Sequence, residues 1–267
     1  MLKRALTIAG SDASGGAGMQ ADLKTFQNYD VYGMSALTVL VAMDYQNNWD
    51  HQIFPVAIET IKSQISTTLE GLNPDVVKTG MLPSVAIIEL VAQQLEIFGK
   101  GKKIVIDPVM ACKGTAPLFP ENTLAILQKL VPLATVLTPN LFEAAQLAKV
   151  DPIKTLEDAK KAAIILHSHG AKFVVIKAVP YDDELIAEVV FNGTTFACFT
   201  HPKLDSSYNH GAGCTFSASI AAQLAKGKEE LQAIADASSY VFSAIAKSEK
   251  LNEFTGALVP DRQIFPA

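Results

Sequence analysis

The sequence lacks an excess of basic residues and lacks any long apolar run. Its 267 residues include 22 Lys and Arg against 27 Asp and Glu, for a formal net charge of −5. A protein that neutralises nucleic-acid phosphates needs a basic surface, so we expect no nucleic-acid partner. No run approaches the roughly 18 apolar residues that cross a bilayer, and the first apolar run is too short for a signal peptide. We therefore expect no membrane contact.

Cysteine is also scarce, with only Cys112, Cys198 and Cys214. No two of them form a CxxC pair, so the sequence indicates neither a zinc site nor a disulfide framework. Reduced thiols are typical of the cytosol, and we predict a cytoplasmic location. Hydrophobic residues make up 49% of the chain and charged residues 18%, which excludes a disordered chain and allows a large core.

Short apolar runs alternate with longer segments of helical spacing. The runs are apolar throughout, which is typical of strands covered on both faces of a parallel sheet. The expected strands are Ala5–Ala9, Ser35–Ala42, Asp75–Lys78, Lys103–Ile106, Ala134–Leu137 and Lys172–Ile176. The expected helices are Met19–Asn28, Pro55–Leu69, Ser84–Ile97, Thr215–Leu224 and Leu231–Ala246.

This alternation predicts an α/β fold with right-handed crossovers. Asn192-Gly193 lies between two β-prone runs, Glu188–Phe191 and Thr195–Phe199, and predicts an antiparallel hairpin at one edge of the sheet. No linker or low-complexity run divides the chain, so we expect a single domain over residues 1–267.

A glycine-rich stretch, Gly10–Gly18, follows the first expected strand. Its small residues allow a ligand or another backbone to approach closely, but it fits neither the dinucleotide fingerprint nor the Walker pattern. Asp22 lies one helical turn further on and could face the same cavity. The alternative is an ordinary turn between a strand and a helix.

A second such stretch, His210–Ala218, opens a helix. Gly211, Ala212 and Gly213 place bare amides ahead of it, and such amides form an anion site. Cys214 falls in the first turn, where the helix dipole favours the thiolate, so it is a candidate base or nucleophile. The alternative is a small buried residue in a glycine-rich turn.

Polar residues follow two further strands. Asn140 and Glu143, three residues apart, suit a magnesium ion held through water; the alternative is a helix cap. Asp107 ends a strand, so its carboxylate is expected in the ligand crevice. Cys112 and Lys113 follow in a loop, where the lysine could meet phosphate and the cysteine could be incidental. An anion site, a carboxylate and a magnesium-type pair together indicate phosphoryl transfer.

Several motifs in this order resemble the ribokinase-like vitamin kinases, over about residues 3–250. They are AGSDASGGAGMQADLKTF, KTGML, IDPVM, TPNLFEA and HGAGCTFSA. The resemblance is to the branch of hydroxymethylpyrimidine (phosphate) kinases and two-cysteine pyridoxal kinases. It implies a three-layer αβα fold with a mostly parallel central sheet, ATP as co-substrate, Mg²⁺ as cofactor, and a homodimer.

The resemblance also implies roles for individual residues. Gly211, Ala212 and Gly213 would cradle the transferring phosphoryl group, and Cys214 would be the base. Asn140 and Glu143 would hold the water shell of the magnesium ion, with Asp107 near the metal and phosphates. Lys177 would contact the nucleotide phosphates. The residues around the substrate ring would be Gly10, Asp22, Met81 and Val109.

Two positions favour pyridoxal as the substrate. Met43 stands where the pyrimidine kinases of this branch have a glutamine, and a thioether cannot read a polar ring edge as an amide does. Cys112 resembles the thiol that adds to the pyridoxal aldehyde in the two-cysteine kinases. The leading hypothesis is thus an ATP-dependent pyridoxal kinase that phosphorylates the 5-hydroxymethyl group. The alternative is a hydroxymethylpyrimidine kinase of thiamine synthesis.

One departure from the family pattern motivates a third hypothesis. Lys177-Ala178-Val179-Pro180 replaces the usual Lys-Gly-Gly, and side chains there restrict the approach of a nucleotide. The third hypothesis is a catalytically weak vitamin-binding protein.

Overall fold

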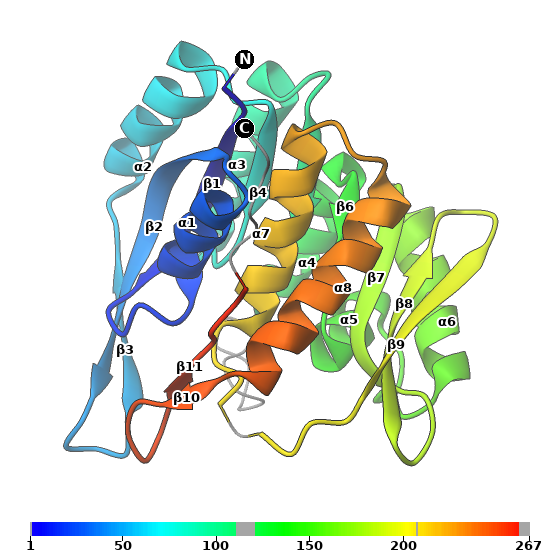
Figure 1. Ribbon diagram of the computed structural model, residues 1–267. Coiled ribbons are helices and arrows are strands. Elements are labelled where there is room, and N and C mark those ends of the chain that lie inside the picture. Colours follow the sequence, from blue (N-terminus) through cyan, green and yellow to red (C-terminus); the bar gives the residue numbers. More distant parts are fainter. Residues whose placement is uncertain (1, 111–120, 207, 262–267) are drawn as a thin grey trace.

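The computed structural model describes residues 2–110, 121–206 and 208–261. Nine strands of this part form one sheet in the order β3-β2-β1-β4-β5-β6-β7-β8-β9, and two short strands, β10 and β11, pair separately (Figure 1). The strands are β1 (Arg4–Asp12), β2 (Tyr32–Asp44), β3 (Asp50–Pro55), β4 (Val76–Thr79), β5 (Lys103–Ile106), β6 (Val136–Leu137), β7 (Phe173–Pro180), β8 (Leu185–Phe191), β9 (Phe196–Pro202), β10 (Glu249–Lys250) and β11 (Gly256–Ala257).

The sheet is parallel from β2 to β7 and antiparallel at both edges. The hairpin predicted around Asn192-Gly193 is confirmed as β8 and β9. The sequence reading missed β3, which pairs with β2 at the opposite edge. This strand carries polar residues and a proline and is held by its partner strand, so its own sequence gives little β signal.

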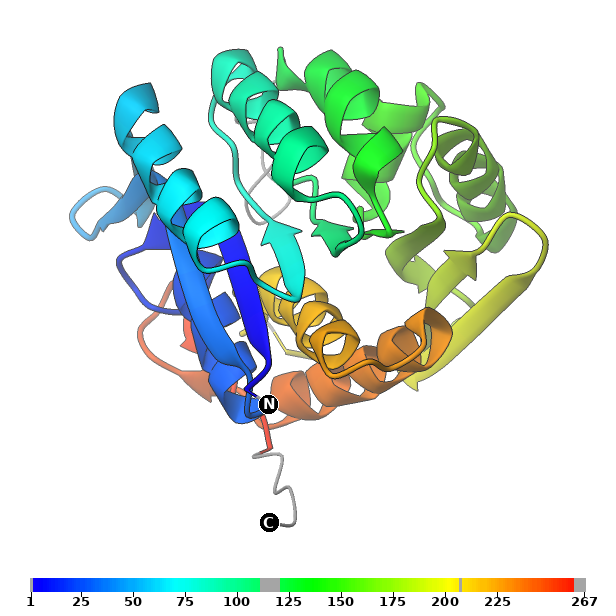
Figure 2. The ribbon, with the colours of Figure 1, turned by 90° about the horizontal axis from the view of Figure 1, so that it is seen from above.

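Helices cover both faces of the sheet, as the view from above shows (Figure 2). The helices are α1 (Gly18–Asn28), α2 (Ile58–Ile65), α3 (Val85–Phe98), α4 (Asn122–Ala125), α5 (Leu141–Ala148), α6 (Leu156–Ser168), α7 (Ala212–Ala225) and α8 (Glu230–Ala246). Helices α1, α7 and α8 form one layer and α2 to α6 the other, so the expected three-layer αβα fold is confirmed. No helix in the described ranges is both long and apolar enough to span a bilayer.

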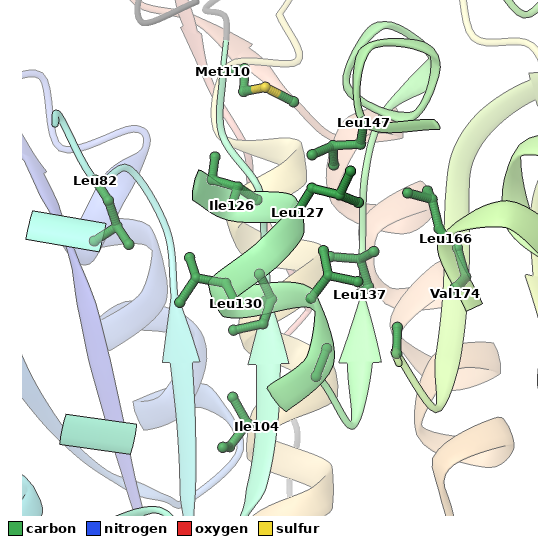
Figure 3. Close-up of a cluster of buried hydrophobic side chains, with 14 of the residues drawn as sticks. Leu82, Ile104, Met110, Ile126, Leu127, Leu130, Leu137, Leu147, Leu166 and Val174 are labelled. Atoms are coloured by element: carbon green, nitrogen blue, oxygen red, sulfur yellow. The ribbon is translucent and has the colours of Figure 1, made fainter. Parts of the chain in front are cut away.

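Each layer has its own hydrophobic core, because successive strand residues point to opposite faces. The larger core packs α3, α5 and α6 on the sheet; its members include Ile104, Leu127, Leu130 and Leu137 (Figure 3). On β4, Val77 points into this core and Val76 into the core under α7. Lys78 follows Val76 by two residues and therefore also faces the layer of α1 and α7.

The strand order reverses at β1, which lies between β2 and β4. In open α/β sheets such a switch point opens a crevice beyond the carboxyl ends of the strands, where ligands bind. Helix α1 begins just after β1, and α7 begins in the same layer beside it. The fold thus brings the two glycine-rich stretches to the same end of the sheet.

Candidate active site

A cavity of about 430 Å³ opens at this end of the sheet. One end is polar and contains most of the residues singled out in the sequence. They are Asp107, Val109, Asn140, Glu143, Lys177, Gly211, Ala212, Gly213 and Cys214. The other end is mainly apolar, with Ile186, Leu204, Val241, Phe242 and Ile245 among its lining residues. Such a cavity suits a ligand with a charged part and a flat apolar part.

The two glycine-rich stretches are in direct contact. Gly211 has φ +83°, and a Cβ atom there would lie 1.9 Å from the Gly16 carbonyl oxygen, so only glycine fits. His210 Nε2 lies 2.7 Å from Asp12 Oδ2. Burial raises the pKa of the Asp12 carboxyl, but hydrogen bonds from His210 and Ser14 outweigh it and hold the pKa below its usual value.

The amides at the start of α7 differ from the expected row of three. Ala212 N–H donates to the Asn209 carbonyl oxygen at 3.1 Å, so this amide is already bonded. Gly213 lies in the first turn, where an N–H group has no partner inside the helix. A Cβ at Gly213 would lie 3.3 Å from Lys177 Nζ, which places the lysine ammonium against the helix start. An anion here would meet both groups.

Asp107 and Lys177 form an ion pair at the polar end. Lys177 Nζ lies 2.8 Å from Asp107 Oδ1, and their side chains are 13% and 2% exposed. Ser217 Oγ donates to the other carboxylate oxygen at 3.2 Å. Burial lowers the pKa of Lys177, but the Asp107 and Glu143 carboxylates outweigh it and raise the pKa above its usual value. Lys177 is therefore a fixed positive charge at the cavity wall.

Asn140 and Glu143 form a capping box at the start of α5. Asn140 Oδ1 accepts from the Glu143 amide at 2.8 Å, and Glu143 Oε2 accepts from the Asn140 amide at 2.9 Å. The cap alternative is thus confirmed, although both residues also line the cavity. Burial, together with the nearby Asp107, raises the pKa of Glu143 to about 7.

Cys214 lines the cavity from the first turn of α7 and accepts a hydrogen bond from the Gly18 amide. Burial raises the pKa of this thiol to about 12, against the opposing effect of the Lys78 ammonium. Burial thus opposes the thiolate form that the position at the start of the helix favours.

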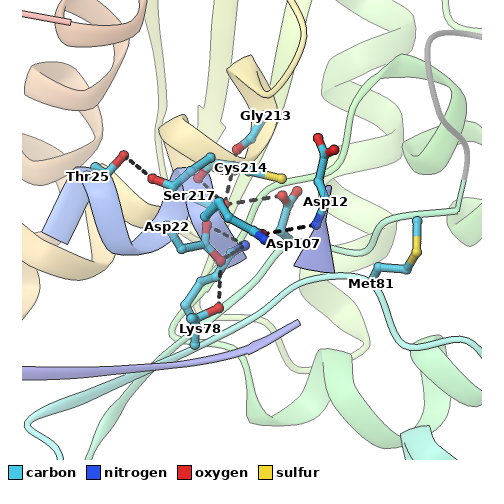
Figure 4. Close-up of polar contacts among 12 residues, drawn as sticks. Asp12, Asp22, Thr25, Lys78, Met81, Asp107, Gly213, Cys214 and Ser217 are labelled. Carbon is cyan, nitrogen blue, oxygen red and sulfur yellow. Dashed lines mark hydrogen bonds and ion pairs between the residues drawn. The ribbon is translucent and has the colours of Figure 1, made fainter. Parts of the chain in front are cut away.

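Asp22 is placed differently from the expectation. Its carboxylate is fully buried, with Lys78 Nζ 2.9 and 2.8 Å from its two oxygens and the Thr7 hydroxyl at 2.6 Å (Figure 4). It lies behind the cavity wall rather than facing the cavity, because α1 turns this side chain toward β1 and β4. A direct contact between Asp22 and a substrate is therefore not supported.

The other expected substrate residues are only partly brought together. Val109 lines the cavity. A Cβ at Gly10 would lie 3.7 Å from Met81 Cβ, so Met81 lies next to Gly10 of β1. Met43 lies near the end of β2, paired with His51 of β3. Gly10, Met43 and Met81 are not on the wall of this cavity, and Cys112, with Lys113, lies outside the described residues.

The sequence reading missed a polar chain at the apolar end. His201 Nε2 lies 2.7 Å from Ser238 Oγ, and Ser238 donates to Glu188. The His201 ring stacks on Phe242 with centroids 4.8 Å apart. Nothing in the sequence connects these residues. Lys78 was also missed, although a lysine at the end of the apolar run Asp75–Lys78 was a visible signal.

The departure after Lys177 has a structural explanation. Ala178 has φ +53°, in the left-handed region that favours glycine, at a bulge between Ile176 and Val179. The backbone at this position therefore has a conformation that favours glycine, although the residue is an alanine. The exposed methyl group lies at the cavity wall.

Comparisons with known proteins agree on one group of kinases. The family model described as phosphomethylpyrimidine kinase matches residues 12–259. Pyridoxine kinase of Bacillus subtilis is 50% identical over 257 residues, which are 96% of this chain and 94% of that protein. A solved structure of Staphylococcus aureus pyridoxal kinase, in complex with AMP-PCP and pyridoxal, is similar with a TM-score of 0.90 and 44% identity, covering 97% of this chain and 93% of that one. Hydroxymethylpyrimidine/phosphomethylpyrimidine kinase of B. subtilis is 43% identical over 245 residues, which are 91% of this chain and 89% of that protein.

Proposed function

Because the chain belongs to the phosphomethylpyrimidine kinase family, we propose that it is an ATP-dependent pyridoxal kinase. The observation that carries the proposal is the meeting of Lys177, Gly213 and Cys214 at one end of a cavity whose other end is apolar. The relatives named pyridoxine and pyridoxal kinase support this substrate class.

The reaction follows from the positions of these groups. The 5-hydroxymethyl oxygen of pyridoxal attacks the terminal phosphorus of ATP, the bond from phosphorus to the bridging oxygen breaks, and ADP leaves. The hydroxyl proton passes to the Cys214 thiolate. The Lys177 ammonium and the Gly213 amide stabilise the charge that develops on the phosphoryl oxygens. Burial raises the pKa of the Cys214 thiol, and the Lys78 ammonium acts in the opposite direction, so this cation favours the thiolate.

We propose that Asp107 and Glu143 hold Mg²⁺ through its water shell. Both are buried carboxyl groups at the cavity wall, and the raised pKa of Glu143 indicates a carboxyl whose nearest charges do not fully offset its burial. Carboxylates in small number suit this ion, which keeps several waters. When bound, Mg²⁺ supplies positive charge next to the phosphates. The described residues contain no cluster of three or more acidic, His or Cys ligands, so the two carboxylates would share the ion with phosphate oxygens and water.

We propose that the apolar end takes the purine of ATP. Phe242 and Ile245 offer flat and aliphatic surface, and His201 and Ser238 offer polar atoms beside it. The phosphates would then reach Lys177 and the start of α7 at the polar end.

The preference for pyridoxal over the pyrimidine rests on Met43 and Cys112. Met43 cannot replace an amide toward an aminopyrimidine edge. Cys112 would add to the pyridoxal aldehyde as a hemithioacetal, and the pyrimidine has no aldehyde. The second candidate is a hydroxymethylpyrimidine kinase, which the 43% identical relative of that name favours.

We also propose a homodimer in the cytoplasm. Leu40 of β2 and Phe54 of β3 are register partners at the sheet edge, and each is about half exposed, which offers apolar surface to a second copy. The cytoplasm is proposed because three widely spaced cysteines without a CxxC pair are typical of a reducing compartment. Sedimentation of the wild-type protein and of Leu40→Asp tests the dimer: the substitution should give monomers.

The experiment that tests the function measures ADP release with Mg²⁺-ATP and pyridoxal, pyridoxine or hydroxymethylpyrimidine in parallel, with product masses. Turnover should be strongest on pyridoxal; preference for the pyrimidine would establish the second candidate. Cys214→Ala should lower kcat by about 10²–10⁴, the usual range for a positioned base, and Cys198→Ala is the matched control. Cys112→Ala should impair pyridoxal more than pyridoxine. Calorimetry that finds pyridoxal binding without Mg²⁺-ATP binding would favour the weak vitamin-binding protein.

A further inference from the structure

A sealed ion pair lies behind the candidate base. Lys78 and Asp22 have fully buried side chains, at 0% exposure each, with Lys78 Nζ 2.8 Å from Asp22 Oδ2. The Thr7 hydroxyl donates to the same oxygen at 2.6 Å. Thr7 and Lys78 are register partners on β1 and β4, so two neighbouring strands and α1 fix the ammonium in one place. Neither charge lines the cavity, so neither can touch a ligand there.

Stability alone does not account for the pair. Removing two charges from water costs about as much as their attraction returns, and apolar residues of similar size are often at least as stable in such places. Apolar side chains such as Ala5, Val76 and Phe216 form the core of the same layer. The buried charges therefore call for a role beyond stability, through a neighbouring group.

That neighbour is Cys214. Among the described residues, the charged groups that act on its thiol are Asp22 from α1, Lys78 from β4, Asp107 after β5 and Lys177 from β7, and the Gly18 amide donates a hydrogen bond to it. Figure 4 shows Asp22, Lys78, Asp107 and Cys214 as one group. The Lys78 ammonium lowers the pKa of the thiol more than the Asp22 carboxylate raises it, so the net effect of the ion pair is that of a positive charge.

We propose that Lys78 is a positioning residue for the catalytic thiol: its ammonium, fixed by Asp22 and Thr7 in a sealed site, favours the thiolate form of Cys214. Asp22 sets how much of this charge reaches the sulfur, because it holds the ammonium and partly offsets it. Lys177, by contrast, faces the cavity and is free to bind phosphate. The proposal rests on the role of Cys214 in the proposed function. The effect of the Lys78 ammonium on the thiol, however, is present in the substrate-free protein.

The test measures the rate at which iodoacetamide alkylates Cys214 in the substrate-free protein, from pH 7 to 11, with modified peptides quantified by mass. Cys198, on β9, is alkylated in the same samples and is the internal control. The variants are Lys78→Met, Asp22→Asn and the double variant Asp22→Asn/Lys78→Met. Lys103→Met, which removes an exposed ion pair with Glu230, is the matched control.

We expect opposite shifts in the two single variants. An opposite charge within about 4–6 Å typically shifts a pKa by about 1–3 units. The profile of Lys78→Met should therefore move to higher pH by about one unit or more, which slows alkylation about tenfold at a given pH. The profile of Asp22→Asn should move to lower pH. The double variant, which leaves no buried charge unpaired, should follow Lys78→Met while staying folded by circular dichroism.

An unchanged Cys214 profile in the double variant would overturn the proposal, and so would equal shifts at Cys214 and Cys198. If Lys78→Met does not fold, the double variant and Asp22→Asn decide the question. The same variants in the kinase assay separate the two proposals. A shifted thiol with unchanged kcat would retain the role of Lys78 and remove Cys214 as the base.

Discussion

Two lysines are each paired with an aspartate at 2.8 Å, yet their surroundings differ. The pair of Lys78 and Asp22 is sealed from solvent, whereas Lys177 and Asp107 lie at the cavity wall. A sealed charge acts only through its field on fixed neighbours, and a charge at the wall is free to change partners when a ligand arrives. Equal distances therefore do not indicate equal roles, and the difference in solvent exposure distinguishes the two ion pairs.

The largest expected effect of breaking either pair concerns stability. Lys78→Met leaves Asp22 buried without its cation, which should cost about 3–5 kcal/mol of unfolding free energy. Lys177→Met leaves Asp107 with hydroxyl donors and cavity water, so its cost should be about 1–2 kcal/mol. Urea denaturation of both variants measures the difference. Equal losses would show that the two sites are equally sealed.

The next effect concerns catalysis, where the substitution at the cavity wall matters directly. Lys177→Met removes a fixed charge at the helix start and should lower kcat by about 10²–10³, as for other preorganised donors. The loss should persist at saturating ATP if it acts on the transition state. A change confined to KM would reduce Lys177 to a ground-state contact. Lys172→Met, on the same strand region but away from the cavity, is the control.

A third prediction concerns the buried carboxyl group of Glu143, which lies near the ion pair of Lys177 and Asp107. Burial raises the pKa of Glu143 to about 7 in the folded protein, above its ordinary value of 4.5. The folded state then binds the proton more tightly, so this stabilising effect is full below about pH 4.5 and is lost as the pH rises through 7. Glu143→Gln keeps the cap acceptor and should remove this part of the pH dependence, on the order of 2 kcal/mol. Denaturation of both proteins between pH 5 and 8 tests it; parallel curves would contradict the prediction.

The smallest effect belongs to the bulge beside Lys177. Ala178→Gly relieves a left-handed backbone position and should raise the unfolding free energy by about 1 kcal/mol. Ala187→Gly, in the neighbouring strand, has no positive φ to relieve and should destabilise. Thermal unfolding distinguishes the two. If Ala178→Gly also improves KM for ATP, the methyl group itself limits the approach of the nucleotide.

Most of the parallel sheet could be predicted from the sequence because its strands are short and apolar on both faces. The edge strand β3 could not, since its conformation depends on pairing with β2. The position of Asp107 and Lys177 at the cavity could be predicted for a related reason: the carboxyl ends of parallel strands lie at the same edge of the sheet. Asp22 was expected to face the cavity, whereas its carboxylate is buried against Lys78 and Thr7; the sequence of α1 does not show which of its faces turns toward β1. The place of Lys78 could not be predicted, because it depends on the register of β4 beside β1 and on the position of Asp22 on α1.

The contact between Asp12 and His210 joins residues 198 positions apart, and the fit of Gly211 against Gly16 depends on the same approach. During synthesis, the strands β1 to β9 leave the ribosome before His210 does. At that stage one face of the sheet still lacks α7 and α8, and the turn after β1 still lacks its partner. The layer of α1, α7 and α8 and the cavity wall are therefore completed together, and activity is the last property that the growing chain acquires.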